Sequence, residues 1–234
     1  MTRDTLDPRE VERMFDRIAG PYDMMNRVMT AGLDRRWREL AAEATGLGNG
    51  ANALDACCGT GDLSLALARL VGRGGQVTGL DFSGEMLERA RKKARQANAA
   101  EITWVQGDAT RMPFADNSFA AATIGFGLRN LPDPEDGLRE LARVVRPGGT
   151  VVVLEITQPA SGPLKPFYGV WFDRVVPTLG RLLDNDAYSY LPASVRRFPP
   201  PDELGEMFWR AGMRDVRYRL LASGIVALHT GEVV

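Results

Sequence analysis

Three aspartates lie at the ends of predicted β-strands, and their side chains are the ones in this sequence best suited to binding a ligand. Asp55 is near the end of the first strand, Asp81 directly follows the second, and Asp108 comes two residues after the third. Ligands of an open parallel sheet bind outside the carboxyl ends of its strands, so we expect the three carboxylates along one rim. Such a rim repels a pyrophosphate and favours a ligand with a cationic centre, hydroxyl groups and an amino group.

The residues around these aspartates narrow the expected ligand to S-adenosylmethionine (SAM). Asp81 lies 26 residues past Asp55, which fits one β–α–β step, after which a carboxylate accepts hydrogen bonds from ribose hydroxyls. Asp108 is placed to accept from an adenine amino group, while the backbone amide of Ala109 donates to the ring. Two glycines nearby allow a tight turn and close approach of the backbone. The predicted SAM-binding residues are therefore Asp55, Gly59, Gly61, Asp81, Asp108 and Ala109.

A dinucleotide site and simple helix capping are the alternatives to this interpretation. The dinucleotide fingerprint needs a third glycine, but the stretch Gly59–Gly61 is followed by Asp62-Leu63-Ser64. A single aspartate at a strand end often caps the next helix, and this role is the alternative for Asp81 taken alone. The ordered set of three aspartates favours a ligand site.

Short apolar strands that alternate with amphipathic helices are expected to position this rim. The alternation predicts an α/β fold with a parallel sheet and helices on both of its faces. The last two strands are joined by a three-residue link, Ala222–Gly224, which favours an antiparallel hairpin. The expected strands are Ala53–Cys57, Gln76–Leu80, Ile102–Gln106, Phe119–Phe126, Thr150–Ile156, Val216–Leu221 and Ile225–Thr230, and the expected helices are Asp62–Leu70, Ser83–Asn98, Pro134–Val145 and Asp202–Ala211.

We interpret residues 1–234 as one domain made of four segments. The first segment is expected to be a helical cover, with helices at Arg9–Ala19 and Arg36–Ala44 and a turn at Gly20-Pro21 between them. Two apolar stripes at every fourth residue of Phe167–Leu183 predict a wide apolar face in the third segment. The segments are 1–45 (helical N-terminal cover), 46–160 (cofactor-binding core), 161–200 (substrate cover) and 201–234 (C-terminal helix and hairpin).

The composition excludes several classes of function. The 234 residues carry a net charge of −1, so a chain-wide basic field for nucleic acid is absent. Cys57 and Cys58 are adjacent and His229 is the single histidine, so neither a disulfide framework nor a Cys/His metal centre is expected. The first residues lack the apolar region of a signal peptide, and no stretch has the ~18 apolar residues of a membrane span. We expect a cytoplasmic protein without a bound metal or a nucleic-acid partner.

Longer blocks of the sequence resemble the C-methyltransferase family of menaquinone and ubiquinone biosynthesis. They extend over nearly the whole chain, and TIGFGLRN and GIVALHTG are far more specific than the general methyltransferase signature. The matching blocks are Phe15–Asn26 (FDRIAGPYDMMN), Trp37-Arg38, Leu54–Asp62 (LDACCGTGD), Asp81–Leu87 (DFSGEML), Gly107–Phe114 (GDATRMPF), Thr123–Asn130 (TIGFGLRN), Arg146–Gly149, Tyr188–Leu191 (YSYL), Phe198-Pro199 and Gly224–Gly231 (GIVALHTG).

This resemblance implies a seven-stranded, Rossmann-like class I SAM-dependent methyltransferase fold. The implied reaction moves a methyl group to a ring carbon of demethylmenaquinol, a polyprenyl naphthoquinol. The double cysteine is similar to the menaquinone branch rather than the ubiquinone branch. Some relatives have a serine that contacts the cofactor where this chain has Gly125, so we do not transfer that contact. The cofactor contacts that the family implies are Thr60, Asp81, Asp108 and Ala109.

Several residues are candidates for making the ring carbon nucleophilic. Arg129 follows the fourth strand and is expected either to stabilise a quinolate oxyanion or to form a salt bridge that holds its loop. Tyr22 is expected either to close over the cofactor or to have only a structural role in its turn. For His229 a buried, hydrogen-bonded role is favoured over catalysis, and for the two cysteines packing is favoured over nucleophilic attack.

The partners expected from this interpretation are a polyprenyl naphthoquinol and a membrane surface. Phe167–Leu183 is expected to line the channel for the polyprenyl tail and to rest on the inner face of the membrane, and a homodimer is compatible with the sequence. Three alternatives stay open: methylation of another aromatic or lipid acceptor, including one in ubiquinone biosynthesis; a module that binds SAM without catalysis; and a nicotinamide oxidoreductase.

Overall fold

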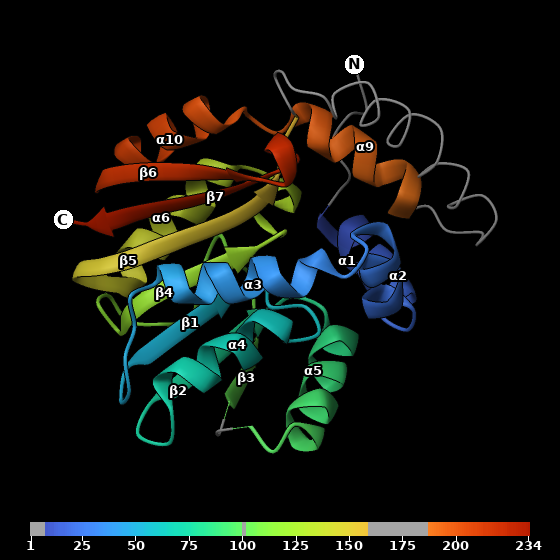
Figure 1. The fold of residues 1–234 in the computed structure, drawn as a ribbon, viewed down its shortest axis with the longest axis horizontal. Coiled ribbons are helices and arrows are strands. Elements are labelled where there is room, and N and C mark those ends of the chain that lie inside the picture. The colour runs from blue at the N-terminus through green and yellow to red at the C-terminus, as the bar shows by residue number, and fades with distance from the viewer. Residues whose placement is uncertain (1–7, 100–101, 159–186) are drawn as a thin grey trace.

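Seven strands form one mixed sheet in the computed structural model, which describes residues 8–99, 102–158 and 187–234 (Figure 1). The strand order is β3-β2-β1-β4-β5-β7-β6, and the order reverses between β1 and β4. The first five strands in this order are parallel, β7 is antiparallel to β5, and β6 is antiparallel to β7. The strands are β1 (Asn52–Ala56), β2 (Gln76–Asp81), β3 (Ile102–Gln106), β4 (Phe119–Gly125), β5 (Val145–Ile156), β6 (Met213–Leu221) and β7 (Val226–Val233).

Helices cover both faces of the sheet, as the pattern predicts. Along β5, Val151 and Val153 pack in one apolar cluster with α6 and α10, whereas Val152 and Leu154 pack in a second cluster with α3 and α4. A strand whose successive side chains are all apolar is buried on both faces. The helices are α1 (Pro8–Ile18), α2 (Tyr22–Met29), α3 (Leu33–Ala44), α4 (Asp62–Val71), α5 (Gly84–Gln96), α6 (Pro134–Val144), α9 (Ala187–Arg197) and α10 (Pro201–Arg210), with short 3₁₀ turns η1 (Leu128–Asn130) and η3 (Ala222–Gly224).

The strand β5 begins five residues earlier than the apolar run predicts. Val145 already pairs with Phe119, and the register then shifts, so that Thr150 pairs with Ala121. The residues between them bulge from the ladder, with Gly148 at φ 75°. The Pro-Gly-Gly sequence, which ends the preceding helix as expected, therefore also makes a bulge at the start of the strand.

Two helices were not predicted. The Gly20-Pro21 signal separates α1 from α2, and Pro21 is the N-cap of α2 rather than part of a longer turn. The other helix, α9, contains Pro192, a residue that normally argues against a helix interior. The apolar stripes of Phe167–Leu183 lie outside the described residues.

Candidate active site

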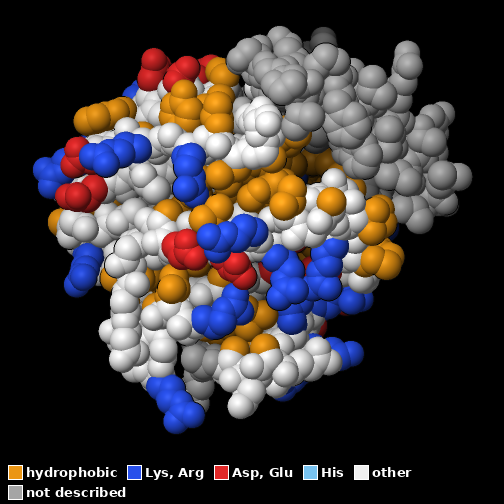
Figure 2. All heavy atoms as spheres, viewed as in Figure 1, with side chains coloured by type: hydrophobic (Ala, Val, Ile, Leu, Met, Phe, Trp, Pro, Cys, Tyr) orange, Lys and Arg blue, Asp and Glu red, His pale blue; other side chains and the backbone are white. Residues whose placement is uncertain are grey.

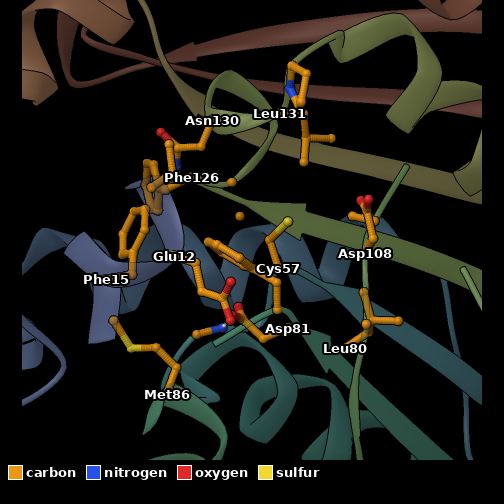
Figure 3. Close-up of a pocket in the computed structure, with 18 of the residues that line it drawn as sticks. Glu12, Phe15, Cys57, Leu80, Asp81, Met86, Asp108, Phe126, Asn130 and Leu131 are labelled. Atoms are coloured by element: carbon orange, nitrogen blue, oxygen red, sulfur yellow. Dashed lines mark hydrogen bonds between the residues drawn. The ribbon is translucent and has the colours of Figure 1, made fainter. Parts of the chain in front are cut away.

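A pocket of about 260 Å³ lies at the carboxyl ends of the parallel strands, where the strand order reverses. Its floor comes from the segments that follow β1 to β4, and its cover comes from α1 and α2, which we call the N-terminal lid. Figure 3 shows side chains from both parts directed into this space. The lining residues are Val11, Glu12, Phe15, Tyr22, Cys57, Gly59, Leu80, Asp81, Phe82, Met86, Gly107, Asp108, Ala109, Gly125, Phe126, Gly127, Asn130, Leu131 and Pro132.

The charged residues that line this pocket are all acidic. They are Glu12, Asp81 and Asp108, and no Lys, Arg or His of the described chain lines the pocket with them. Basic side chains are instead visible on the outer surface of the molecule (Figure 2). No group of three or more metal-binding side chains is found in the described ranges. The pocket is thus suited to a cationic or hydroxyl-rich organic ligand, and its described lining offers no counter-charge for a phosphate.

Asp81 ties the glycine-containing loop to the start of α5. One carboxylate oxygen accepts the Gly59 amide at 2.7 Å, and the other accepts the Ser83 amide at 3.0 Å. Burial raises the pKa of Asp81 to about 6, and hydrogen bonds from the backbone oppose this shift. Asp81 is not the helix cap that was the alternative for it, because the N-cap of α5 is Ser83, whose hydroxyl accepts from the Met86 amide at 3.1 Å. A carboxylate has further lone pairs, and those of Asp81 are available to a ligand in the pocket.

Two of the expected glycines have different roles. Gly59 lines the pocket at φ 54°, so its backbone is open to a ligand. Gly61 does not line the pocket; it is the N-cap of α4 at φ 84°, and a Cβ there would come within 2.6 Å of the Trp104 ring. Gly61 therefore allows close packing of α4 and is not a pocket residue.

Asp108 and Ala109 both line the pocket, at the end of β3. One oxygen of Asp108 accepts hydrogen bonds from the amide and the hydroxyl of Thr110, each at 2.8 Å. This Asx turn holds the Asp108 carboxylate beside Ala109, which is buried.

Asp55 and Thr60 lie outside the pocket lining. Asp55 is buried below the floor, where its oxygens accept from Ser64 Oγ at 2.6 Å and Thr123 Oγ1 at 2.8 Å. Burial also raises the pKa of Asp55 to about 6. The Thr60 hydroxyl donates to Asp23 of α2 at 2.5 Å. The structure thus places Asp55 as a brace between β1, α4 and β4, and Thr60 as an anchor for the lid.

The N-terminal lid is attached to the core by polar contacts, a few aromatic rings and a small apolar cluster of Ile18 and Ala19 with Met86 of α5. Ser83 Oγ donates to Asp16 of α1 at 2.5 Å, and Lys93 of α5 pairs with Asp23 of α2 at 2.7 Å. Phe15 meets Phe82 edge to face, with ring centroids 6.1 Å apart, and it meets Tyr22 edge to face at 6.2 Å. These contacts place Phe15 and Tyr22 in the pocket wall.

Arg129 is held in a buried ion pair. Its Nη1 lies 2.8 Å from Glu155 Oε1 and also donates to the Phe126 carbonyl, and the side chains of Arg129 and Glu155 are 8% and 1% exposed. Arg129 does not line the pocket, whereas its neighbour Asn130 does. The geometry matches the salt-bridge role that was the alternative to an oxyanion role.

The surroundings of Cys57 and His229 agree with the packing roles that the sequence favours for them. Cys57 lines the pocket at φ 50°, and burial with nearby carboxylates raises the pKa of its thiol, so the reactive thiolate is disfavoured. His229 is fully buried, contacts the Pro201 carbonyl at 2.9 Å and stacks on Phe208. Burial lowers the pKa of His229, as expected for a neutral core histidine.

Glu12, Phe82 and Asn130 are pocket residues that the sequence did not single out. Phe82 and Asn130 lie inside the matching blocks DFSGEML and TIGFGLRN, which is a signal that could have identified them. Glu12 lies on an amphipathic helix outside any block, and only the docking of that helix brings it to the pocket.

Comparison with known proteins agrees with this geometry. Residues 3–233 match the model of the ubiE/COQ5 methyltransferase family. A demethylmenaquinone methyltransferase of Desulfitobacterium hafniense (strain Y51) is 45% identical over 225 residues, which is 95% of this chain and 89% of that protein. A protein of the same name from Staphylococcus aureus (strain JH9) is 41% identical over 99% of this chain and 96% of its own length.

Solved structures with the same fold are more distant in sequence. The [4+2]-cyclase SpnF has a TM-score of 0.73 at 20% identity and covers 98% of this chain and 97% of its own. A SAM-dependent methyltransferase from Aquifex aeolicus has a TM-score of 0.61 at 18% identity, with 98% and 100% covered. The expected seven-stranded class I methyltransferase fold is confirmed. By its match over almost its entire length, the chain belongs to the ubiE/COQ5 methyltransferase family.

Proposed function

We propose that this protein transfers a methyl group from SAM to a ring carbon of demethylmenaquinol, giving menaquinol. The observation that carries the proposal is the pocket at the strand ends, whose charged residues are all acidic. Membership of the ubiE/COQ5 family and the printed names of its relatives support the choice of acceptor. No feature of the described pocket favours a nicotinamide dinucleotide, because a pyrophosphate would face three carboxylates there.

The residues present fit the parts of SAM. Asp81 would accept from the ribose hydroxyls, and Asp108 with the Ala109 amide would bind the adenine edge. The open backbone at Gly59 would lie against the donor, and Phe82 would provide an apolar surface. Asp55, Thr60 and Gly61 support these contacts from outside the pocket, by the hydrogen bonds and packing described above.

Alignment is the main task of the protein in this reaction. When bound, SAM supplies an activated methyl group on a sulfonium. In-line placement of two reactants contributes about 7–11 kcal/mol to lowering a barrier. A rigid floor, with Asp81 tied through two backbone amides, and an aromatic wall from Phe15 and Tyr22 would hold both reactants in line.

The acceptor must be the reduced quinol, since loss of a hydroxyl proton raises electron density on the neighbouring ring carbon. Assistance of that proton transfer typically adds about 10²–10⁴-fold to the rate. Tyr22 lines the pocket and would hydrogen-bond the acceptor oxygen. Arg129 lies outside the pocket lining, and its ion pair with Glu155 would hold the loop that brings Asn130 to the pocket.

The polyprenyl tail requires an apolar path to the surface. We assign this role to the substrate cover, residues 161–200, and we place the protein in the cytoplasm with transient contact to the membrane. The lid supports the proposed membrane contact, because two apolar side chains of α2, Met24 and Val28, are each 61% exposed and lie near the basic Arg27. None of the described helices is long and apolar enough to cross a bilayer.

The direct test is methyl transfer from labelled SAM to a naphthoquinol with an isoprenoid tail, kept reduced. We expect label on the ring carbon with the quinol and none with the oxidised quinone. A benzoquinol and a simple phenol serve as comparison acceptors. Binding of SAM without transfer to any reduced quinone, or faster transfer to another acceptor class, would contradict the proposal.

A further inference from the structure

Glu12 is the one charged residue that the described part of the N-terminal lid contributes to the pocket lining. Figure 3 shows its side chain extending from α1 into the pocket, toward the side where Asp81 and Cys57 lie. No lysine or arginine of the described chain pairs with its carboxylate. A lid residue with an unneutralised charge therefore points at the space that a ligand would occupy.

The docking of α1 fixes this direction. Glu12 and Asp16 are four residues apart and so share one face of the helix. Asp16 accepts from Ser83 Oγ at 2.5 Å, and Ser83 follows the end of β2 by two residues. Phe15 rests on Phe82 at the same strand end. The contacts that attach the lid to β2 thus also bring Glu12 over the pocket.

A closed lid places three carboxylates around one cavity that no basic residue of the described chain lines. Glu12 on the lid and Asp81 and Asp108 on the floor repel one another, and the burial of Asp81 strengthens the repulsion at that residue. A positive charge between them converts the repulsion into attraction. Closure of the lid is therefore favoured by a cationic ligand and disfavoured by a neutral one.

We propose that Glu12 makes the lid sensitive to the charge on the donor sulfur, an inference that rests on the proposed function. In the transfer, an electron pair of the ring forms the new carbon–carbon bond, the sulfur–methyl bond breaks with its electrons on sulfur, and the ring carbon loses its proton to solvent. The sulfonium becomes a neutral thioether. Glu12 then holds the lid closed over SAM and releases it over the product, S-adenosylhomocysteine.

Binding of SAM and of S-adenosylhomocysteine, measured separately by calorimetry, tests this proposal without turnover. We expect Glu12→Gln to raise the Kd for SAM about tenfold and the Kd for S-adenosylhomocysteine no more than about twofold. Glu12→Asp keeps the charge and should preserve most of the ratio between the two constants. Glu10→Gln, which removes an exposed charge from the same helix, is the matched control and should change neither constant by more than about twofold.

Hydrogen exchange of the lid gives a second reading. In the natural protein, SAM should protect the amides of residues 8–29 from exchange more than S-adenosylhomocysteine does. In Glu12→Gln, the two ligands should protect these amides equally. If Glu12→Gln lost equal affinity for both ligands, Glu12 would bind a part that they share, and the charge-sensing role would be overturned. No loss of affinity for either ligand would overturn that role as well. If the natural protein bound neither ligand, the proposed function itself would fail.

Discussion

The floor of the pocket and its N-terminal lid are held in place in different ways. On the floor, Asp81 accepts from two backbone amides, and Arg129 and Glu155 form a buried pair. The lid is attached through Asp16, Asp23 and a small apolar cluster in which Ile18 and Ala19 pack on Met86 of α5, and the Asp23–Lys93 pair is partly exposed to solvent. Exposed pairs contribute little stability each, whereas a buried pair is costly to break. We therefore expect the floor to be preorganised and the lid to be the part that opens.

The largest effect should come from breaking the buried pair of the floor. Arg129→Gln leaves Glu155, 1% exposed, without its partner, and we expect the free energy of unfolding to fall by about 3–5 kcal/mol. Urea denaturation measures this loss. The matched control is Arg36→Gln, which breaks two ion pairs of an arginine side chain that is 58% exposed and should cost less than about 1 kcal/mol. Equal losses for the two variants would refute the contrast.

Removal of the floor carboxylate should abolish most of the binding of SAM. We expect Asp81→Ala to raise the Kd for SAM about a hundredfold, because it removes the ribose acceptor and frees the Gly59 amide. Calorimetry gives the Kd, and circular dichroism checks that the fold is retained. Asp116→Ala, which removes an exposed carboxylate outside the pocket, should bind SAM normally. Unchanged affinity in Asp81→Ala would reject the ribose assignment.

The affinity for SAM should depend on pH through the same residue. The pKa of Asp81 in the free protein is about 6, and a bound cation lowers it, so binding below pH 6 requires loss of a proton. The affinity is thus constant above about pH 6 and falls as pH drops through that value, approaching tenfold per pH unit. Asp81→Asn should bind more weakly, with a flat profile from pH 7.5 to 5. A natural protein with an equally flat profile would show that the ionised carboxylate is not used.

A smaller effect is expected from loosening the lid. Asp23→Ala removes a partner of both Thr60 and Lys93, and we expect about a three- to fivefold rise in the Kd for SAM. Cleavage of residues 8–29 by a protease should become faster. Asp62→Ala also removes a partner of Lys93, at 2.7 Å, but leaves the lid attached, so it is the matched control. If both variants behaved alike, the Asp23 contact would not hold the lid.

The same contrast explains what could be predicted from the sequence. The floor follows from local rules: apolar strands end at the same edge of the sheet, so Asp81, Asp108 and Ala109 meet in one pocket. Asp55 also lies near a strand end, but the strand has not yet left the sheet at this residue. Its side chain is therefore buried below the floor. Glu12 could not be predicted, because its place depends on how α1 docks onto β2 and α5, and an acidic residue on an amphipathic helix gives no sign of its neighbours.

The most direct test of the account is a crystal structure of the protein with SAM or S-adenosylhomocysteine bound. We expect the ribose hydroxyls to contact Asp81, the adenine to lie between Phe82 and the Asp108–Ala109 segment, and the sulfur to face the side of the pocket lined by Cys57 and Tyr22. Density for the ligand at another place, or a ligand at the strand ends without contact to Asp81 or Asp108, would contradict it.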